Sequence, residues 1–151
     1  MITLQQIDRS NYMECIFLKV RAGQETFVAS NAQSLVEAQF EEGLYTKAIY
    51  ADETMIGFVL YDYDPEIPGW SMSRFMIGEQ YQGQGFGKKA VLEFIKYMKE
   101  EMKIQELYIS VGQENKVAYE LYKTLGFIES KPIEYEVNGI IYHEIQMKLA
   151  L

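Results

Sequence analysis

The chain has 151 residues, of which 48% are hydrophobic and 24% are charged. This length suits one domain with one core, because a chain of this size buries roughly two thirds of its unfolded surface. The 14 basic and 22 acidic residues give a formal charge of −8, which disfavours nucleic-acid binding and favours cationic partners.

No apolar run is long enough to cross a bilayer, and the N-terminus lacks the basic and apolar regions of a signal peptide. We therefore expect a cytoplasmic, soluble protein with no membrane partner. The single cysteine, Cys15, cannot form an intramolecular disulfide and agrees with a reducing compartment. Its apolar surroundings favour a small buried hydrophobe over a covalent acyl carrier. The sequence leaves open whether the chain forms a homodimer.

Helices and strands interleave along the whole chain. Periodicity and turn residues place them, in order, at 2–7 (strand), 12–20 and 30–42 (helices), 45–50, 55–63 and 70–77 (strands), 90–102 (helix), 107–111 (strand), 115–125 (helix) and two closing strands joined by Asn138-Gly139. Ser30 or Asn31 caps the second helix, and Asn138-Gly139 is a hairpin signal because both residues tolerate positive φ. We expect one α/β (α+β) domain over residues 1–151, with a mixed, mostly antiparallel central sheet flanked by helices.

A glycine-rich turn separates the strand at 70–77 from the helix at 90–102. It reads Gln82-Gly83-Gln84-Gly85-Phe86-Gly87-Lys88. Without Cβ atoms the backbone can approach a ligand closely, and the first amides of a helix have no intrahelical partner. The turn therefore predicts an anion cradle for phosphates, to which Lys88, and less directly Lys89, can add positive charge.

Spacing excludes two common phosphate cradles. A dinucleotide fingerprint needs a third glycine where the chain has Lys88, and a Walker loop needs a glycine at Gln82 and a hydroxyl residue at Lys89. The pattern that remains is Gln-x-x-Gly-x-Gly.

A second segment, residues 115–127, follows about thirty residues later. Asn115 is a good N-cap, one helical face is apolar, and Gly126 supplies a left-handed stop. The glycine turn resembles the acetyl-CoA signature of the GNAT (Gcn5-related) N-acetyltransferase superfamily, and residues 115–127 resemble its N-x-x-A-x-x-x-Y-x-x-x-G-F segment. The resemblance spans roughly residues 45 to 150. Residues 24–38 are also similar to the bacterial spermine/spermidine acetyltransferase subgroup.

This resemblance implies a single-domain GNAT fold and direct transfer of an acetyl group from acetyl-CoA to a primary amine. Tyr122 aligns with the general acid of the family, and a phenol with a pKa of about 10 stays protonated at neutral pH. The competing interpretation is a tyrosine that only packs on its helix. Asn115 is either a cofactor contact or only a cap.

No cluster with metal-ligand spacing is present in the sequence. The resemblance also implies where the cofactor lies. The pantetheine arm is expected along the strand before the turn, and the phosphates on the backbone amides of the turn. The expected cofactor residues are Phe75, Met76 and Ile77 for the arm, and Gln82, Gly83, Gln84, Gly85, Phe86, Gly87 and Lys88 for the phosphates.

The general base is harder to place, because the strand at 70–77 contains no acid. Asp62, Asp64 and Glu66 lie just before it and can act directly, act through a water, or be ordinary surface acids. Arg74 is either a salt-bridge partner or a site residue. His143 is expected to be a packed strand residue and not the base.

The acceptor prediction rests on charge. Acids interleaved with tyrosines suit a polyamine, which offers ammonium groups for ion pairs and methylenes for ring contacts. The predicted lining is Glu25, Glu37, Glu41, Glu42, Asp62 and Asp64 with Tyr45, Tyr61 and Tyr63. Ordinary surface acidity explains the same residues equally well. The alternatives are an acetyltransferase for a peptide N-terminus, a lysine or an aminoglycoside, and a non-catalytic acyl-CoA sensor, which the intact Tyr122 segment disfavours.

Overall fold

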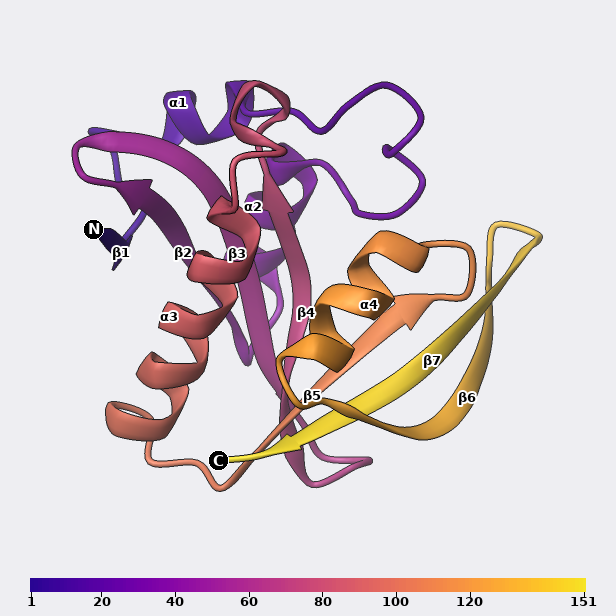
Figure 1. Ribbon diagram of the computed structural model, residues 1–151. Helices are drawn as coiled ribbons and strands as arrows, with labels where there is room; N and C mark the ends of the chain where they lie inside the picture. Colours follow the sequence, from indigo (N-terminus) through magenta and orange to yellow (C-terminus); the bar gives the residue numbers. More distant parts are fainter.

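The computed structural model describes residues 1–151, and Figure 1 shows the arrangement of its elements. In chain order these are β1 (Ile2–Gln5), α1 (Tyr12–Phe17), α2 (Asn31–Phe40), β2 (Leu44–Ala51), β3 (Thr54–Asp64), β4 (Gly69–Ile77), the 3₁₀ turn η1 (Glu79–Tyr81), α3 (Phe86–Glu100), β5 (Glu106–Gly112), α4 (Lys116–Thr124), β6 (Ile128–Val137) and β7 (Ile140–Ala150). The predicted order of helices and strands is confirmed. No helix has the length and apolar character needed to span a bilayer.

Two boundaries differ from the prediction by three or four residues, both at backbone turns. The first helix ends at Phe17 and not at residue 20, because Leu18 already has extended backbone (ψ 125°). The helix α3 starts four residues before residue 90, at Phe86, directly after Gly85 as N-cap with φ 83°. The glycine turn therefore runs straight into the helix. Ser30 caps α2 as expected, its hydroxyl accepting from the Gln33 N–H.

The strands form one seven-stranded sheet in the order β1-β2-β3-β4-β5-β7-β6. Every neighbouring pair is antiparallel except β4 and β5, which are parallel. This pair is short: Trp70–Met72 lie beside Leu107–Ile109 and pairing then stops, although β4 keeps its β3 partner as far as Ile77. The sheet consequently opens between the last residues of β4 and of β5.

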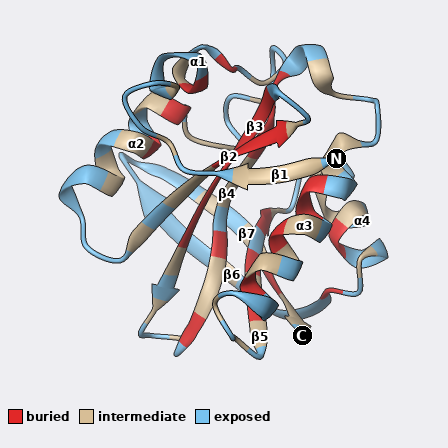
Figure 2. Cartoon of the chain, turned by 90° about the vertical axis from the view of Figure 1, so that its left-hand side faces the viewer, coloured by how far each residue is buried: buried red, intermediate tan, exposed pale blue.

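The sheet separates two layers of helices, with α1 and α2 on one side and α3 and α4 on the other (Figure 2). One hydrophobic cluster joins Val59 and Tyr61 to α3 and α4, and the other joins Phe58 and Leu60 to α1 and the residues around α2. Side chains alternate between the two faces of a strand. This alternation decides which predicted site residues share a face.

Candidate functional site

The glycine turn presents a row of free backbone donors. Gly83 and Gly85 have φ of 76° and 83°, in the left-handed region that glycine favours. No N–H group from Gly83 to Lys88 makes a backbone hydrogen bond within the chain, and the next amide, that of Lys89, closes on the Gly85 carbonyl at 3.4 Å. Free amides at the N-terminus of a 15-residue helix attract anions.

Gln82 does a different job from its neighbours. Its backbone N–H is already bonded to the Glu79 carbonyl, at 3.4 Å, so this amide does not belong to the free row that the sequence predicted to start here. Its side-chain amide donates to the Ile77 carbonyl at 2.8 Å and to Gln24 Oε1 at 3.1 Å. Gln82 therefore ties the turn to the end of β4 and to the segment between α1 and α2.

That segment also brings a cation to the turn. The Glu79 N–H donates to the Lys19 carbonyl at 2.7 Å, and a Cβ placed on Gly83 would lie 3.7 Å from the Arg21 guanidinium. Arg21 makes no ion pair within the chain. Two further cations, Lys88 and Lys89, lie on the first turn of α3. Sequence reasoning missed Arg21, because nothing local to residue 21 signals its contact with residue 83.

The opening between β4 and β5 lies next to this turn. Phe75, Met76 and Ile77 belong to the part of β4 that has no strand partner on its β5 side. Backbone polar groups without a partner are satisfied by water or by a ligand. An extended ligand with amide groups can take the place of a strand there, which is the position that the resemblance implies for pantetheine.

Tyr122 comes from α4, which Figure 1 shows in front of β5 and to the right of β4. The side chain is buried and its ring packs edge-on against Phe127, with centroids 5.6 Å apart and planes at 67°. Its hydroxyl makes no hydrogen bond within the chain. Since no fully buried side-chain N or O atom lacks a partner, this hydroxyl reaches solvent. Burial raises the pKa of Tyr122 above its usual value, which keeps the phenol protonated.

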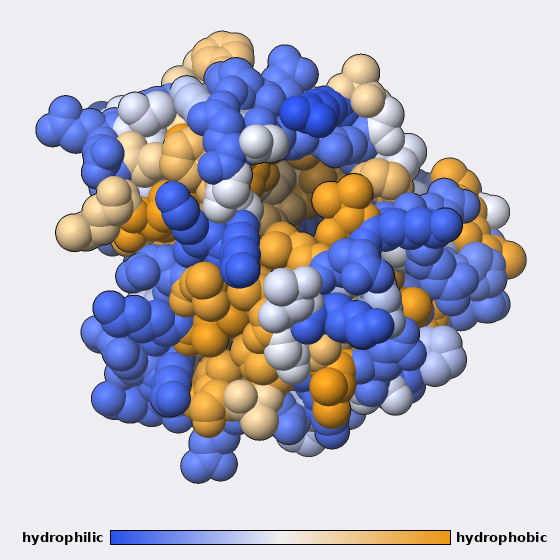
Figure 3. All heavy atoms as spheres, in the orientation of Figure 1, coloured by the Kyte–Doolittle hydropathy of each residue, from blue (hydrophilic) through white to orange (hydrophobic).

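Residues on both sides of Tyr122 fix the helix. Asn115 Oδ1 accepts from the Ala118 N–H at 3.3 Å, so Asn115 is the N-cap of α4. Gly126, at φ 102°, turns the chain back into β6. In the space-filling view the surface is hollowed between the N-terminal end of α3 and α4 (Figure 3).

Among the three candidate bases, Asp62 has the most unusual surroundings. Ser73 donates to Asp62 Oδ1 at 2.5 Å, and Ser73 is the extra residue of a β-bulge in β4, since Leu60 pairs with Arg74 and Tyr61 with Met72. Burial raises the pKa of Asp62, and the charge of Asp64 adds to this, while the Ser73 bond and Arg74 oppose it. Asp64 accepts from the Glu66 N–H at 2.9 Å and so forms the turn before β4.

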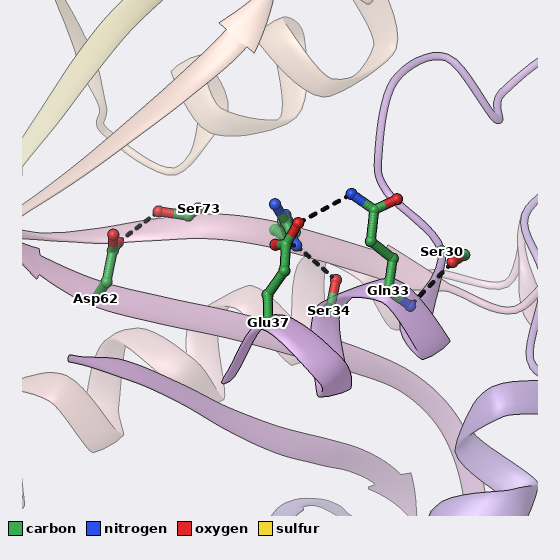
Figure 4. A network of polar contacts seen from close by, with 7 residues as sticks. Ser30, Gln33, Ser34, Glu37, Asp62 and Ser73 are labelled. Carbon is green, nitrogen blue, oxygen red and sulfur yellow. Dashed lines mark hydrogen bonds and ion pairs between the residues drawn. The ribbon is translucent and has the colours of Figure 1, made fainter. Parts of the chain in front are cut away.

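Arg74 links β4 to α2, and Figure 4 shows how Gln33, Ser34 and Glu37 of α2 lie in this network. Its Nη1 lies 2.5 Å from Glu37 Oε2 and donates to Ser34 Oγ at 3.0 Å. Gln33 holds the other Glu37 oxygen at 3.0 Å, and the hydrogen bonds from Gln33 and Arg74 lower the pKa of Glu37. The sequence left two roles open for Arg74, and in the structure this residue is a salt-bridge partner.

The prediction that the acids and tyrosines line one groove is wrong. Tyr61 faces α3, where its hydroxyl lies 3.2 Å from that of Tyr97 and its ring stacks on Tyr45. Asp62 points to the opposite face, with Leu60 and Arg74. The two-residue period of β3 separates the tyrosines from the acids.

Two single residues complete the comparison with the sequence. Cys15 is fully buried, and burial raises the pKa of its thiol to about 11, which confirms the prediction of a small hydrophobe. His143 lies in β7 but is not packed: 55% of its side chain is exposed, and its Nδ1 lies 3.2 Å from Glu134 Oε2. His143 shares a face of β7 with Ile145 and Met147, but it lies before the part of that face that packs against the hydrophobic cluster.

Comparison with known proteins agrees with this geometry. The family model described as "Acetyltransferase (GNAT) family" matches residues 9–127. A spermine/spermidine N(1)-acetyltransferase of Bacillus subtilis is 25% identical over 151 residues, covering 95% of this chain and 99% of that protein. An alpha/beta-tubulin-N-acetyltransferase 9 of Drosophila melanogaster is 27% identical over 126 residues, covering 82% of this chain but 56% of that protein.

The fold also matches a solved structure. A crystal structure of spermidine N-acetyltransferase from Vibrio cholerae, in complex with CoA and spermine, superposes with a TM-score of 0.75 at 18% identity, covering 99% of this chain and 95% of that one. The family match covers most of the chain, includes the glycine turn and ends at Phe127 just after Tyr122. The chain therefore belongs to the GNAT acetyltransferase family and is an acetyl-CoA-dependent N-acetyltransferase.

Proposed function

We propose that the chain moves the acetyl group of acetyl-CoA to a primary amine of a polyamine such as spermidine or spermine. One observation carries the proposal: the structure has free amides in the turn before α3, an opening in the sheet next to that turn, and a protonated Tyr122 on α4. The polyamine acceptor is supported by the similarity, over nearly the whole chain, to the Bacillus subtilis enzyme. The formal charge of −8 agrees with a cationic acceptor.

In this proposal the cofactor binds mostly through the backbone. The amides from Gly83 to Lys88 hold the pyrophosphate, with Arg21 as an added cation. The pantetheine amides pair with the free edge of β4 at Phe75, Met76 and Ile77. Asn115 uses its Oδ1 for the cap, so its Nδ2 is left to donate to the cofactor.

The chemistry is a single acyl transfer. The neutral amine nitrogen attacks the thioester carbonyl carbon, a C–N bond forms, the C–S bond breaks, and the departing thiolate takes the proton of the Tyr122 hydroxyl. The nitrogen loses one proton as the amide forms, and this proton restores the Tyr122 phenol. The amine must first lose its own proton. We assign this step to Asp62, directly or through a water, because a raised pKa makes a carboxylate a better base. Asp64 and Glu66 then add negative charge near the acceptor.

A thiol-release assay with an amine panel tests the proposal. Spermine and spermidine are expected to give a higher kcat/KM than an N-terminal peptide, a lysine peptide or an aminoglycoside. A peptide that outperforms both polyamines would instead support a protein acceptor, for which the partial similarity to the Drosophila protein is the one observation in favour. A chain that binds acetyl-CoA calorimetrically but releases thiol with no amine would be a sensor.

A further inference from the structure

One face of the β6–β7 hairpin carries polar and aromatic side chains that the proposed mechanism does not use. Ile145 and Met147 pack against the hydrophobic cluster beside α3 and α4, so the alternating residues Glu144 and Gln146 point to the other side of the sheet. Tyr142 is on that side too, since it lies two residues before Glu144, and Tyr135 is directly opposite it on β6. We call Tyr135, Tyr142, Glu144 and Gln146 the hairpin face.

No helix covers this part of the sheet on that side. Figure 1 shows α1 and α2 behind β2, β3 and β4, whereas β7 and β6 extend beyond them. The hairpin face nevertheless adjoins the opening described above. Gln146 is paired with Ser110 of β5, and Ser110 is the first residue of β5 beyond the three that pair with β4.

Gln146 is a buried residue whose side-chain amide has no hydrogen-bond partner within the chain. Only 5% of this residue is exposed, and its side-chain amide makes no hydrogen bond within the chain. Because no fully buried side-chain N or O atom lacks a partner, the Gln146 amide reaches solvent through a narrow exposed part of the residue. A buried side-chain amide is normally hydrogen-bonded. Here both the donor and the acceptor of the Gln146 side chain lack a partner within the chain.

Glu144 lies beside Gln146 without a cation. The Tyr135 hydroxyl donates to Glu144 Oε2 at 2.9 Å, and the rings of Tyr135 and Tyr142 stack with centroids 5.3 Å apart and planes at 15°. Burial raises the pKa of Tyr135 to about 12 and the bond to Glu144 adds to this, so the phenol remains a donor. The charge of Arg74 lowers the pKa of Tyr135. This guanidinium is already paired with Glu37, with Nη1 2.5 Å from Oε2.

On this side of the sheet the positive and negative side chains lie at different ends of β7. Lys148 follows Gln146 on β7, and Lys131 lies opposite Gln146 on β6, so both lysines are at the end away from Glu144. A polycation is therefore attracted to the Glu144 end. Glu144 lies two residues from Gln146, about 7 Å along the strand, which is comparable with the three or four methylenes that separate the nitrogens of spermidine.

We propose that the hairpin face binds the part of the polyamine that is not acetylated. Glu144 pairs with a distal ammonium group, the stacked rings of Tyr135 and Tyr142 contact the methylenes, and the Gln146 amide hydrogen-bonds a nitrogen nearer the opening. Aromatic rings and a carboxylate together bind alkylammonium groups. This subsite rests on the proposed polyamine acceptor and makes Glu144 the residue that selects for a second positive charge.

The test uses two isosteric variants on the same hairpin. Glu144→Gln removes the charge but keeps an acceptor for Tyr135, and Glu134→Gln makes the same change on the opposite face, beside His143. We expect Glu144→Gln to raise the KM for spermidine roughly tenfold, with kcat and the KM for acetyl-CoA nearly unchanged. Butylamine, which has no distal ammonium, should react equally with both variants. Gln146→Leu should raise the KM for spermidine by roughly threefold.

The outcomes separate the subsite from the function. If the wild type acetylates spermidine and Glu144→Gln behaves as Glu134→Gln does, the subsite is wrong and the proposed function stands. If the KM for butylamine rises as much as that for spermidine, Glu144 has no selective role and the subsite is again wrong. If the wild type neither acetylates spermine nor binds it in calorimetry with CoA present, both proposals fail. Circular dichroism of each variant excludes loss of fold as the cause.

Discussion

Replacing Gly85 tests the anion cradle with little disturbance of the protein. A Cβ built on Gly85 meets no atom within 4 Å, so the new side chain would project into open space. The cost to the fold is then the left-handed backbone alone, at φ 83°: about 1–2 kcal/mol for a residue with a Cβ, or roughly 2–8 °C in Tm for a chain of this size. Gly43 has the same φ and equally open surroundings, so Gly43→Glu matches Gly85→Glu in strain and charge.

Only Gly85→Glu places a carboxylate where the phosphates are expected. At about 8 Å and an effective dielectric constant of about 20, one pair of like charges costs about 2 kcal/mol. This corresponds to roughly a 30-fold loss of acetyl-CoA affinity. Calorimetric titration of the wild type and both variants measures it, with thermal unfolding as the control for strain. Equal affinities for the two variants would contradict the cradle, because their net charge and backbone cost are the same.

Three further predictions concern the cofactor and the proton transfers. Tyr122→Phe should lower kcat by roughly 100-fold or more at unchanged acetyl-CoA affinity; since burial raises the pKa of Tyr122, wild-type kcat should not fall through ionisation of this phenol below about pH 10. Asp62→Asn should lower kcat/KM by roughly 100-fold in the thiol-release assay. Its Tm at neutral pH should stay equal or rise, because a carboxyl whose pKa is raised by folding costs stability as pH increases from its unfolded to its folded pKa. Arg21→Gln should weaken acetyl-CoA binding and flatten its dependence on salt in calorimetry, unlike Arg9→Gln, a change at an exposed arginine just before α1.

The features that the sequence predicted well are local ones. The cap at Ser30 and the hairpin at Asn138-Gly139 each depend on the conformational preferences of one or two residues. The mixed sheet followed from the order of these elements. The family followed from two short segments, an anion cradle and a capped helix, each of which is encoded within a few consecutive residues.

The features that could not be predicted depend on pairing between distant segments. Arg21 reaches Gly83 only because the segment between α1 and α2 folds over the turn. The extra residue Ser73 reverses which residues of β4 face α2, and this brings Arg74 to Glu37. The separation of the acids from the tyrosines in β3 is different, because the two-residue period of the predicted strand already implied it and only a count of residues between 45 and 66 overlooked it.

The distribution of charge agrees with the proposed binding of two substrates of opposite sign. A uniformly acidic surface would repel acetyl-CoA, and a uniformly basic one would repel a polyamine. Free cations, Arg21, Lys88 and Lys89, gather around the turn before α3, whereas the carboxylates of Asp62 and Glu144 have only hydroxyl groups as hydrogen-bond partners. The two regions meet at the opening between β4 and β5. Bound acetyl-CoA would bring its negative phosphates to the cationic side, offset the repulsion between the cations and an arriving polyamine, and so favour the complex in which both substrates are present.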